Sequence, residues 1–291
     1  MIQGTATAIV TPFKPNGELD EQGLRELVSF QESNGVDYIV PVGTTGESAT
    51  LTHAEHLQVI RIAMDQAKKA KVIAGAGSNS TSEAIHLSKG ARDLGVHAIL
   101  SISPYYNKPT QAGLVKHYEA ISKAVDVPIV VYNVPGRTGG NINPPTVLKL
   151  AEMPNIVAIK EASGNMSQIM AILERAPKGF SVISGDDALT FPIMALGGKG
   201  VISVASNVAP GHVSSMVRHA LEGRWEEARK EHFKLLPLFN HLFLETNPIP
   251  VKTGLRMMGK PSGAFRLPLC DMDPNNQETL RKTMAALGLV K

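Results

Sequence analysis

The chain alternates short, continuously apolar runs with amphipathic stretches, and this unit recurs eight times before residue 210. Parallel strands that helices cover on both faces are apolar along their whole length, so the pattern predicts parallel strands joined by helices. Eight such units in succession predict an α/β fold of the (β/α)8 or TIM-barrel type. The expected strands are residues 6–10, 38–42, 72–76, 98–102, 129–132, 156–160, 181–184 and 200–204.

Signals for helix starts lie between the expected strands. Thr52 with Glu55, and Ser80 with Glu83, have the spacing of a capping box, in which two side chains bond each other's backbone N–H groups. Asn143 precedes a proline that suits the first position of a helix. These signals support a helix after each strand.

After residue 209 the pattern changes to helices only. Pro268 and the glycines and proline of residues 259–263 interrupt this region without adding a strand. We therefore expect residues 1–209 to form a barrel that carries the active site, and residues 210–291 to form an all-helical extension packed on it. The expected helices of this extension are residues 212–222, 225–243, 250–258 and 277–287.

Composition and charge argue against several classes of protein. The 29 basic residues are interspersed with 26 acidic ones, so nucleic acid is not an expected partner. No apolar run approaches the roughly 18 residues that span a bilayer, and the N-terminus does not have the pattern of a signal peptide. The single cysteine, Cys270, cannot form an intrachain disulfide, which favours a reducing compartment. We expect a cytoplasmic protein.

Lys160 ends the apolar strand that begins at Ile156. An ammonium buried at a strand end is costly unless it is paired or deprotonated. A deprotonated lysine is a nucleophile that forms a Schiff base with a carbonyl compound. The alternative is a structural lysine that extends into solvent or pairs with Glu161. This segment by itself leaves both interpretations open.

Polar residues and glycines follow most of the expected strands, at the end of the barrel where active sites are built. The turn 43–47, Gly-Thr-Thr-Gly-Glu, could hold a carboxylate with its N–H groups or simply connect a strand to a helix. Tyr132 could transfer protons near the lysine or be a core aromatic. Of Tyr105 and Tyr106, we expect at most one to point into the pocket.

Charged residues near the strand ends have similar alternatives. Arg137, flanked by glycines in an accessible loop, could bind a substrate carboxylate or be a solvated surface residue. Asp186 and Asp187 have no His or Glu at ligand spacing, so no metal site is expected. His53 and His56 share a helical face without a third ligand, and we expect them to be exposed or hydrogen-bonded.

Three motifs together resemble the dihydrodipicolinate synthase family, within the N-acetylneuraminate lyase superfamily of class I aldolases. They are Gly43–Glu47, Tyr132–Gly139 and Ile159–Gly164, and the resemblance extends from Gly4 to the segment Asn247–Lys252. It implies a Schiff-base-forming carbon–oxygen lyase that condenses pyruvate with L-aspartate 4-semialdehyde in diaminopimelate and lysine biosynthesis. It also implies a homotetramer built from two dimers.

The resemblance implies a catalytic set of four residues. Lys160 would form the imine with pyruvate, without any cofactor. Tyr132 would be the acid and base, linked through Thr44 to Tyr106, which a neighbouring subunit would contribute.

Four further residues would contact the substrates. By the same resemblance, Thr45 would bind the pyruvate carboxylate with backbone N–H groups, and Arg137 would hold the carboxylate of the aldehyde. Gly185 and Ile202 would line the pocket around the lysine.

Feedback inhibition by L-lysine at a subunit interface is a further implication of the resemblance. Glu83 would bind the effector's ammonium, and Asn79 and Tyr105 its carboxylate. The structural alternative is that the Glu83 carboxylate is used by its capping box. The matching positions are Ser48, Ala49, His53, His56, Gly77, Asn79, Glu83 and Tyr105.

Three alternative functions remain at this point. Lyases of the same superfamily that cleave sialic acid or keto-deoxy sugar acids share the lysine and the tyrosine but generally lack the Gly-Arg-Thr-Gly pattern of residues 136–139. A metal-dependent aldolase on a barrel would need ligands at the strand ends, and the sequence does not offer a set. A non-catalytic barrel could bind a keto acid and regulate a partner.

Overall fold

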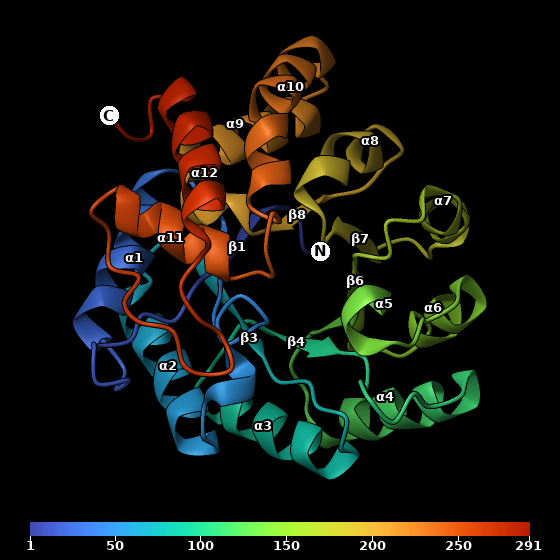
Figure 1. Ribbon diagram of the computed structural model, residues 1–291. Coiled ribbons are helices and arrows are strands. Elements are labelled where there is room, and N and C mark those ends of the chain that lie inside the picture. The colour runs from blue at the N-terminus through green and yellow to red at the C-terminus, as the bar shows by residue number, and fades with distance from the viewer.

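The computed structural model describes residues 1–291. Eight parallel strands close into a barrel in the order β1 to β8, and helices surround it (Figure 1). This arrangement confirms the predicted (β/α)8 barrel. The strands are β1 (Gly4–Ala8), β2 (Tyr38–Val40), β3 (Lys71–Gly75), β4 (Ala98–Ile102), β5 (Ile129–Asn133), β6 (Ile156–Glu161), β7 (Ser181–Ser184) and β8 (Gly200–Ser203).

Helices follow every strand, and three more helices follow the barrel. The first group is α1 (Glu21–Ser33), α2 (His53–Gln66), α3 (Thr81–Asp93), α4 (Gln111–Ala124), α5 (Pro135–Thr138), α6 (Pro144–Leu150), α7 (Met166–Arg175), α8 (Thr190–Ala195) and α9 (Pro210–Leu221). Single 3₁₀ turns are η1 (Ser48–Thr50), η2 (Asp187–Leu189) and η3 (Ala205–Asn207). The C-terminal helices are α10 (Trp225–His241), α11 (Ile249–Met257) and α12 (Pro274–Ala286).

The structure confirms that the C-terminal part is helical, but α9, which the sequence assigned to the extension, belongs to the barrel. It packs against β1 and β8 as the outer helix of the eighth βα unit, so the helices beyond the barrel are α10 to α12. The division of the chain into two domains at residue 209 stays a prediction. None of the helices combines the length and the hydrophobicity needed to cross a membrane.

β1 and β2 differ from their predicted bounds by two residues, whereas the other strands agree to within one residue at each end. The backbone N–H of Val10 donates to the side chain of Asn207 at 3.2 Å, and β1 already ends at Ala8. β2 ends at Val40, because Val42 has a φ of +52°, which a strand does not accommodate. The apolar residues after these strands are buried, and burial explains their hydrophobicity without strand geometry.

Alternation along the strands produces an inner and an outer core. Successive side chains of a strand point to opposite faces of the sheet. In β5, Val130 and Tyr132 belong to the core inside the barrel, whereas Val131 packs with the surrounding helices. In β6, Ala158 belongs to the inner core, and Lys160, two positions further on, points the same way. The alternation therefore directs Tyr132 and Lys160 into the barrel.

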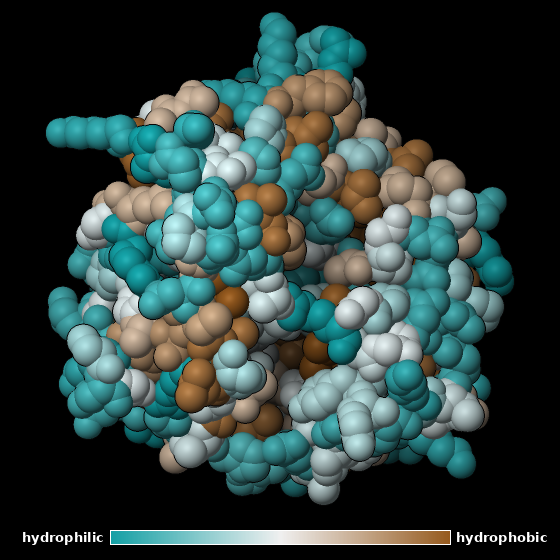
Figure 2. All heavy atoms as spheres, in the orientation of Figure 1, coloured by the Kyte–Doolittle hydropathy of each residue, from teal (hydrophilic) through white to brown (hydrophobic).

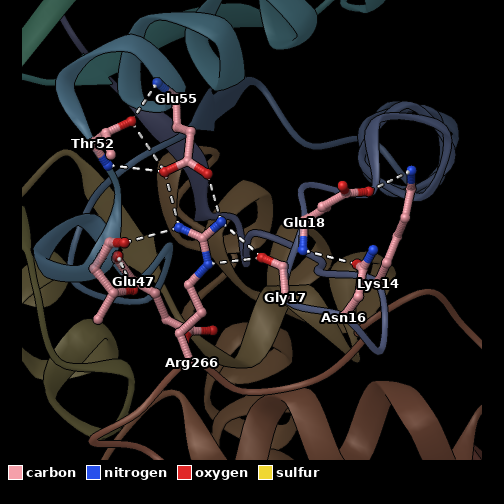
Figure 3. A network of polar contacts seen from close by, with 9 residues as sticks. Lys14, Asn16, Gly17, Glu18, Glu47, Thr52, Glu55 and Arg266 are labelled. Atoms are coloured by element: carbon pink, nitrogen blue, oxygen red, sulfur yellow. Dashed lines mark hydrogen bonds and ion pairs between the residues drawn. The ribbon is translucent and has the colours of Figure 1, made fainter.

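The segment between α11 and α12 loops in front of α2 at one side of the barrel, and one arginine fastens it there (Figure 1). Arg266 donates to both carboxylate oxygens of Glu55, at 2.5 and 2.9 Å (Figure 3). It also donates to the carbonyls of Gly17 and Thr50, and it lies 4.3 Å from the centre of the Phe13 ring. This side chain connects the C-terminal part to α2 and to the loop before α1.

The Arg266–Glu55 pair predicts a pH dependence of stability. The Arg266 guanidinium lowers the pKa of Glu55 from 4.5 to about 2. The pair therefore stabilises the fold fully above pH 4.5, and its contribution is lost as the pH falls towards about 2. We expect Glu55→Gln to lower the urea midpoint at neutral pH, with a difference from the parent chain that shrinks as the solution is acidified through this range.

Urea titrations over this pH range measure the effect. Lys14→Met is the matched control, because it removes an exposed pair with Glu18, which contributes at most about 1 kcal/mol. A midpoint difference for Glu55→Gln that stays constant with pH would contradict the prediction.

Candidate active site

Lys160 and Tyr132 lie together inside the barrel. They are paired in register on β6 and β5, and the Lys160 Nζ atom is 4.2 Å from the centre of the Tyr132 ring. Each side chain is only 6% exposed. Glu161 is not the partner of this lysine, because its carboxylate accepts from the Asn133 amide at 3.1 Å and from the Ser163 N–H at 2.7 Å. The structural alternative of a Lys160–Glu161 pair is therefore wrong, and the amine is buried without an anionic partner.

Gly185 provides the space that the Lys160 side chain occupies. A Cβ atom at Gly185 would lie 3.0 Å from the Lys160 Cε atom and 2.7 Å from the Cβ atom of Ala162. Both distances are too short for ordinary packing. Ile202, on β8, is 1% exposed and belongs to the inner core together with Tyr132. Gly185 therefore makes room for the lysine, and Ile202 packs in the same core as the tyrosine.

A cavity of about 430 Å³ lies beside Tyr132 at the carboxyl ends of the strands. Figure 2 shows this face of the molecule hollowed near its centre. Thr44, Tyr132 and Arg137 line the cavity. Five of the eight predicted catalytic and substrate-binding residues are not part of its wall, namely Lys160, Tyr106, Thr45, Gly185 and Ile202.

Asn247 connects the two predicted carboxylate sites. Its Nδ2 atom donates to Thr45 Oγ1 at 2.9 Å, and its backbone carbonyl accepts from Arg137 Nη2 at 3.2 Å. It is 5% exposed, and it also lines the cavity. The sequence offered a signal in the segment Asn247–Lys252, but only the fold brings this asparagine to residues so distant along the chain.

Arg137 lies in a short helix and not in the loop that the sequence suggested. Pro135 takes the first position of α5, where a proline is favoured, and Gly139 ends the helix with a φ of +70°. The Arg137 side chain reaches the cavity wall from this helix. Of the glycines around Arg137, Gly136 therefore lies within a helical turn and Gly139 ends it.

The predicted proton relay is incomplete within a single chain. Thr44 and Tyr132 line the same cavity, whereas Tyr106 lies outside it and is 89% exposed. Tyr105 does line the cavity, which agrees with the expectation that at most one of the two tyrosines points inward. A relay through Tyr106 would need a neighbouring subunit.

Most of the residues expected to bind lysine line this same cavity. Asn79 is the exception, and its carbonyl accepts from the Asn107 amide at 2.9 Å. His56 is buried and bonds the Gly75 carbonyl at 2.7 Å, as expected of a hydrogen-bonded histidine, and burial lowers its pKa. The residues in the wall are Ser48, Ala49, His53, His56, Gly77, Glu83 and Tyr105.

The Glu83 carboxylate is not used by a capping box. Ser80 accepts from the Glu83 N–H, but the carboxylate contacts the Ser78 hydroxyl and the His53 Nε2 atom, the latter at 2.6 Å. The bond from Ser78, and next the bond from His53, lower the pKa of Glu83. The capping explanation of Glu83 is therefore wrong, and a charged carboxylate stands in the cavity wall at neutral pH. The Thr52–Glu55 box, by contrast, is complete.

The space at Gly185 generates a prediction. We expect Gly185→Ala to displace the Lys160 side chain and to slow the reaction of its amine by about tenfold or more, because the added methyl group overlaps Cε. The rate of imine trapping with a keto acid and borohydride measures this. Gly211→Ala in α9 is the control, because its Cβ would meet only one ordinary contact at 3.5 Å. Equal rates in the two variants would contradict the prediction.

Comparisons with known proteins find relatives over the whole chain. The family model described as the dihydrodipicolinate synthetase family matches residues 1–287. The chain is 54% identical over 292 residues to a protein of Syntrophobacter fumaroxidans named 4-hydroxy-tetrahydrodipicolinate synthase, and the match covers 100% of both chains.

Solved structures show the same fold. The chloride-inhibited dihydrodipicolinate synthase of Acinetobacter baumannii, complexed with pyruvate, has a TM-score of 0.98 and 44% identity, with 100% of both chains covered. The enzyme of Cyanidioschyzon merolae with lysine bound has a TM-score of 0.96 and 46% identity, with 99% of both chains covered.

Proposed function

Because this chain belongs to the dihydrodipicolinate synthetase family, we propose that it is a 4-hydroxy-tetrahydrodipicolinate synthase. It condenses pyruvate, bound as an imine of Lys160, with L-aspartate 4-semialdehyde in the diaminopimelate and lysine pathway. The observation that carries this proposal is the buried Lys160–Tyr132 pair beside a cavity with Arg137 in its wall. The pyruvate complex of a relative supports the first substrate. No cofactor is required beyond the covalent imine.

The proposed reaction uses Lys160 as the nucleophile and Tyr132 as the proton carrier. The lysine nitrogen attacks the ketone carbon of pyruvate, and loss of water leaves a C=N bond. Removal of a methyl proton then gives the enamine, whose carbon attacks the aldehyde. Both steps need a proton carrier within reach of the nitrogen. Tyr132 is that carrier in this proposal, since its ring lies against the amine.

Two substrates that both carry carboxylates need two anion sites. The turn Gly43–Glu47 offers backbone N–H groups for pyruvate, and Asn247 orients the Thr45 hydroxyl within this turn. Arg137 offers a guanidinium for the aldehyde's carboxylate, and the Asn247 carbonyl limits the directions in which that side chain can point. Arg137 is the feature that favours this function over the lyases of sugar acids.

The complete site also involves a second copy of the chain. Tyr106 is exposed and therefore available to a neighbouring subunit, where it would complete the relay through Thr44. We propose a homotetramer built from two dimers. We also propose a cytoplasmic location, which suits a biosynthetic enzyme with one free cysteine.

Borohydride trapping tests the proposed function. With pyruvate and borohydride, we expect a reduced pyruvyl adduct on Lys160, located by peptide mass spectrometry. Arg137→Ala should keep this adduct but lose roughly 10- to 100-fold in kcat/KM for the aldehyde, because a charge-assisted carboxylate contact is removed.

Two outcomes would contradict this function. A folded chain without an adduct on Lys160 would contradict imine chemistry. An Arg137→Ala variant with the parent's kcat/KM for the aldehyde would instead favour one of the sugar-acid lyases.

Inhibition by L-lysine is the second part of the proposal. The lysine-bound structure of a relative supports it, and so does the charged Glu83 carboxylate in the cavity wall of this chain. We expect lysine to lower the steady-state rate and Glu83→Gln to raise the half-inhibitory concentration by about tenfold or more, because the carboxylate that would bind the ammonium is lost.

A lysine titration of parent and variant measures this effect. Glu119→Gln is the matched control, because it removes an exposed carboxylate that pairs only with Lys123 on α4. A flat titration of the parent chain well into the millimolar range would remove lysine regulation.

A further inference from the structure

A second buried lysine lies outside the cavity and reacts with nothing in the proposed mechanism. The Lys252 ammonium, on α11, donates to Glu47 Oε1 at 2.5 Å, to the Ala264 carbonyl at 2.8 Å and to the Thr11 carbonyl at 3.2 Å. It also lies 4.8 Å from the centre of the Phe13 ring. All three of its protons are used, so it is a structural cation and not a second nucleophile.

The Lys252–Glu47 pair contributes little net stability to the fold, because both of its charges are removed from water. Both side chains are fully buried, and the second oxygen of Glu47, Oε2, has no partner. Two apolar side chains of similar volume commonly stabilise as well as a buried ion pair, because desolvation offsets the attraction of the charges. An ion pair can instead fix a position, because the Lys252 ammonium holds the Glu47 carboxylate at one place.

Glu47 is the last residue of the turn Gly43–Glu47, which contains the two threonines Thr44 and Thr45. Glu47 has a φ of +54°, in the left-handed region that residues with a side chain rarely adopt. Its N–H donates to the Thr44 carbonyl at 3.1 Å, and the Gly46 N–H donates to the Gly43 carbonyl at 3.1 Å. The conformation of Glu47 is thus coupled directly to that of Thr44.

The C-terminal part contacts this turn at two points. Asn247 donates to Thr45 near the middle of the turn, and Lys252 binds Glu47 at its end. Both contacts come from one short segment at the start of α11. The segment therefore fixes the turn in position and not only in conformation.

We propose that Lys252 is a positioning residue for the keto acid. Through Glu47 it holds the turn Gly43–Glu47 so that the N–H groups of Thr44 and Thr45 and the threonine hydroxyls receive the carboxylate of pyruvate. This inference rests on the proposed function, which assigns pyruvate to that turn. In this arrangement the C-terminal helices complete the active site of the barrel.

The experiment measures how strongly pyruvate binds in variants of the pair. We expect Lys252→Met and Glu47→Gln to raise the pyruvate concentration that half-saturates borohydride trapping on Lys160 by about tenfold. The KM for the aldehyde should stay within about twofold of the parent value, because Arg137 is held by a different contact.

The double variant Glu47→Leu/Lys252→Met separates positioning from stability. It removes both charges together, so we expect a melting temperature near the parent's. The half-saturating pyruvate concentration should nevertheless stay raised, because the turn has lost its anchor. This variant also carries the test if either single variant fails to fold.

Glu55→Gln is the control, since it weakens another polar anchor of the C-terminal part, the Arg266–Glu55 pair, without changing a residue of the turn. It should lower the melting temperature and leave pyruvate saturation unchanged. The proposal is overturned if the folded double variant saturates like the parent, or if Glu55→Gln raises the value equally. A parent chain that forms no adduct would instead overturn the proposed function.

Discussion

The alternation of side chains along closed parallel strands is the constraint on which the rest of this structure depends. Because the barrel is closed, each strand has one face inside and one face against the helices. Residues two positions apart therefore share a compartment. Tyr132 and Lys160 meet because they occupy paired positions of the same parity on neighbouring strands. A shift of one residue in either strand would send its polar side chain among the helices instead.

Contacts between residues far apart in the sequence complete the active site that the barrel strands begin to form. Asn247, Lys252 and Arg266 each reach back from the C-terminal part to a loop or helix at the mouth of the barrel. Each contact uses a polar group that is largely withdrawn from solvent, where hydrogen bonds are strong and their geometry is restrictive. Helices that look like an appendix in the sequence therefore shape the site.

The sequence predicts best where a local rule and the tertiary structure agree. The apolar runs identify all eight strands, since burial on both faces leaves a clear pattern. Prediction fails where a local rule has a competitor. Glu83 has the spacing of a capping box, but its carboxylate bonds His53 from another helix. Val42, beyond β2, is apolar because it is buried, and its positive φ excludes it from the strand.

The sequence by itself determined the barrel, the position of Lys160 and Tyr132 at strand ends, and the family to which the chain belongs. These features can be predicted from short-range patterns and motifs, because such patterns do not depend on contacts between distant residues. Only the tertiary structure decided which side chains face the cavity, that Lys160 is unpaired, and that Asn247 and Lys252 hold the threonine turn. Such contacts join residues far apart along the chain, and chain spacing carries no information about which of them meet.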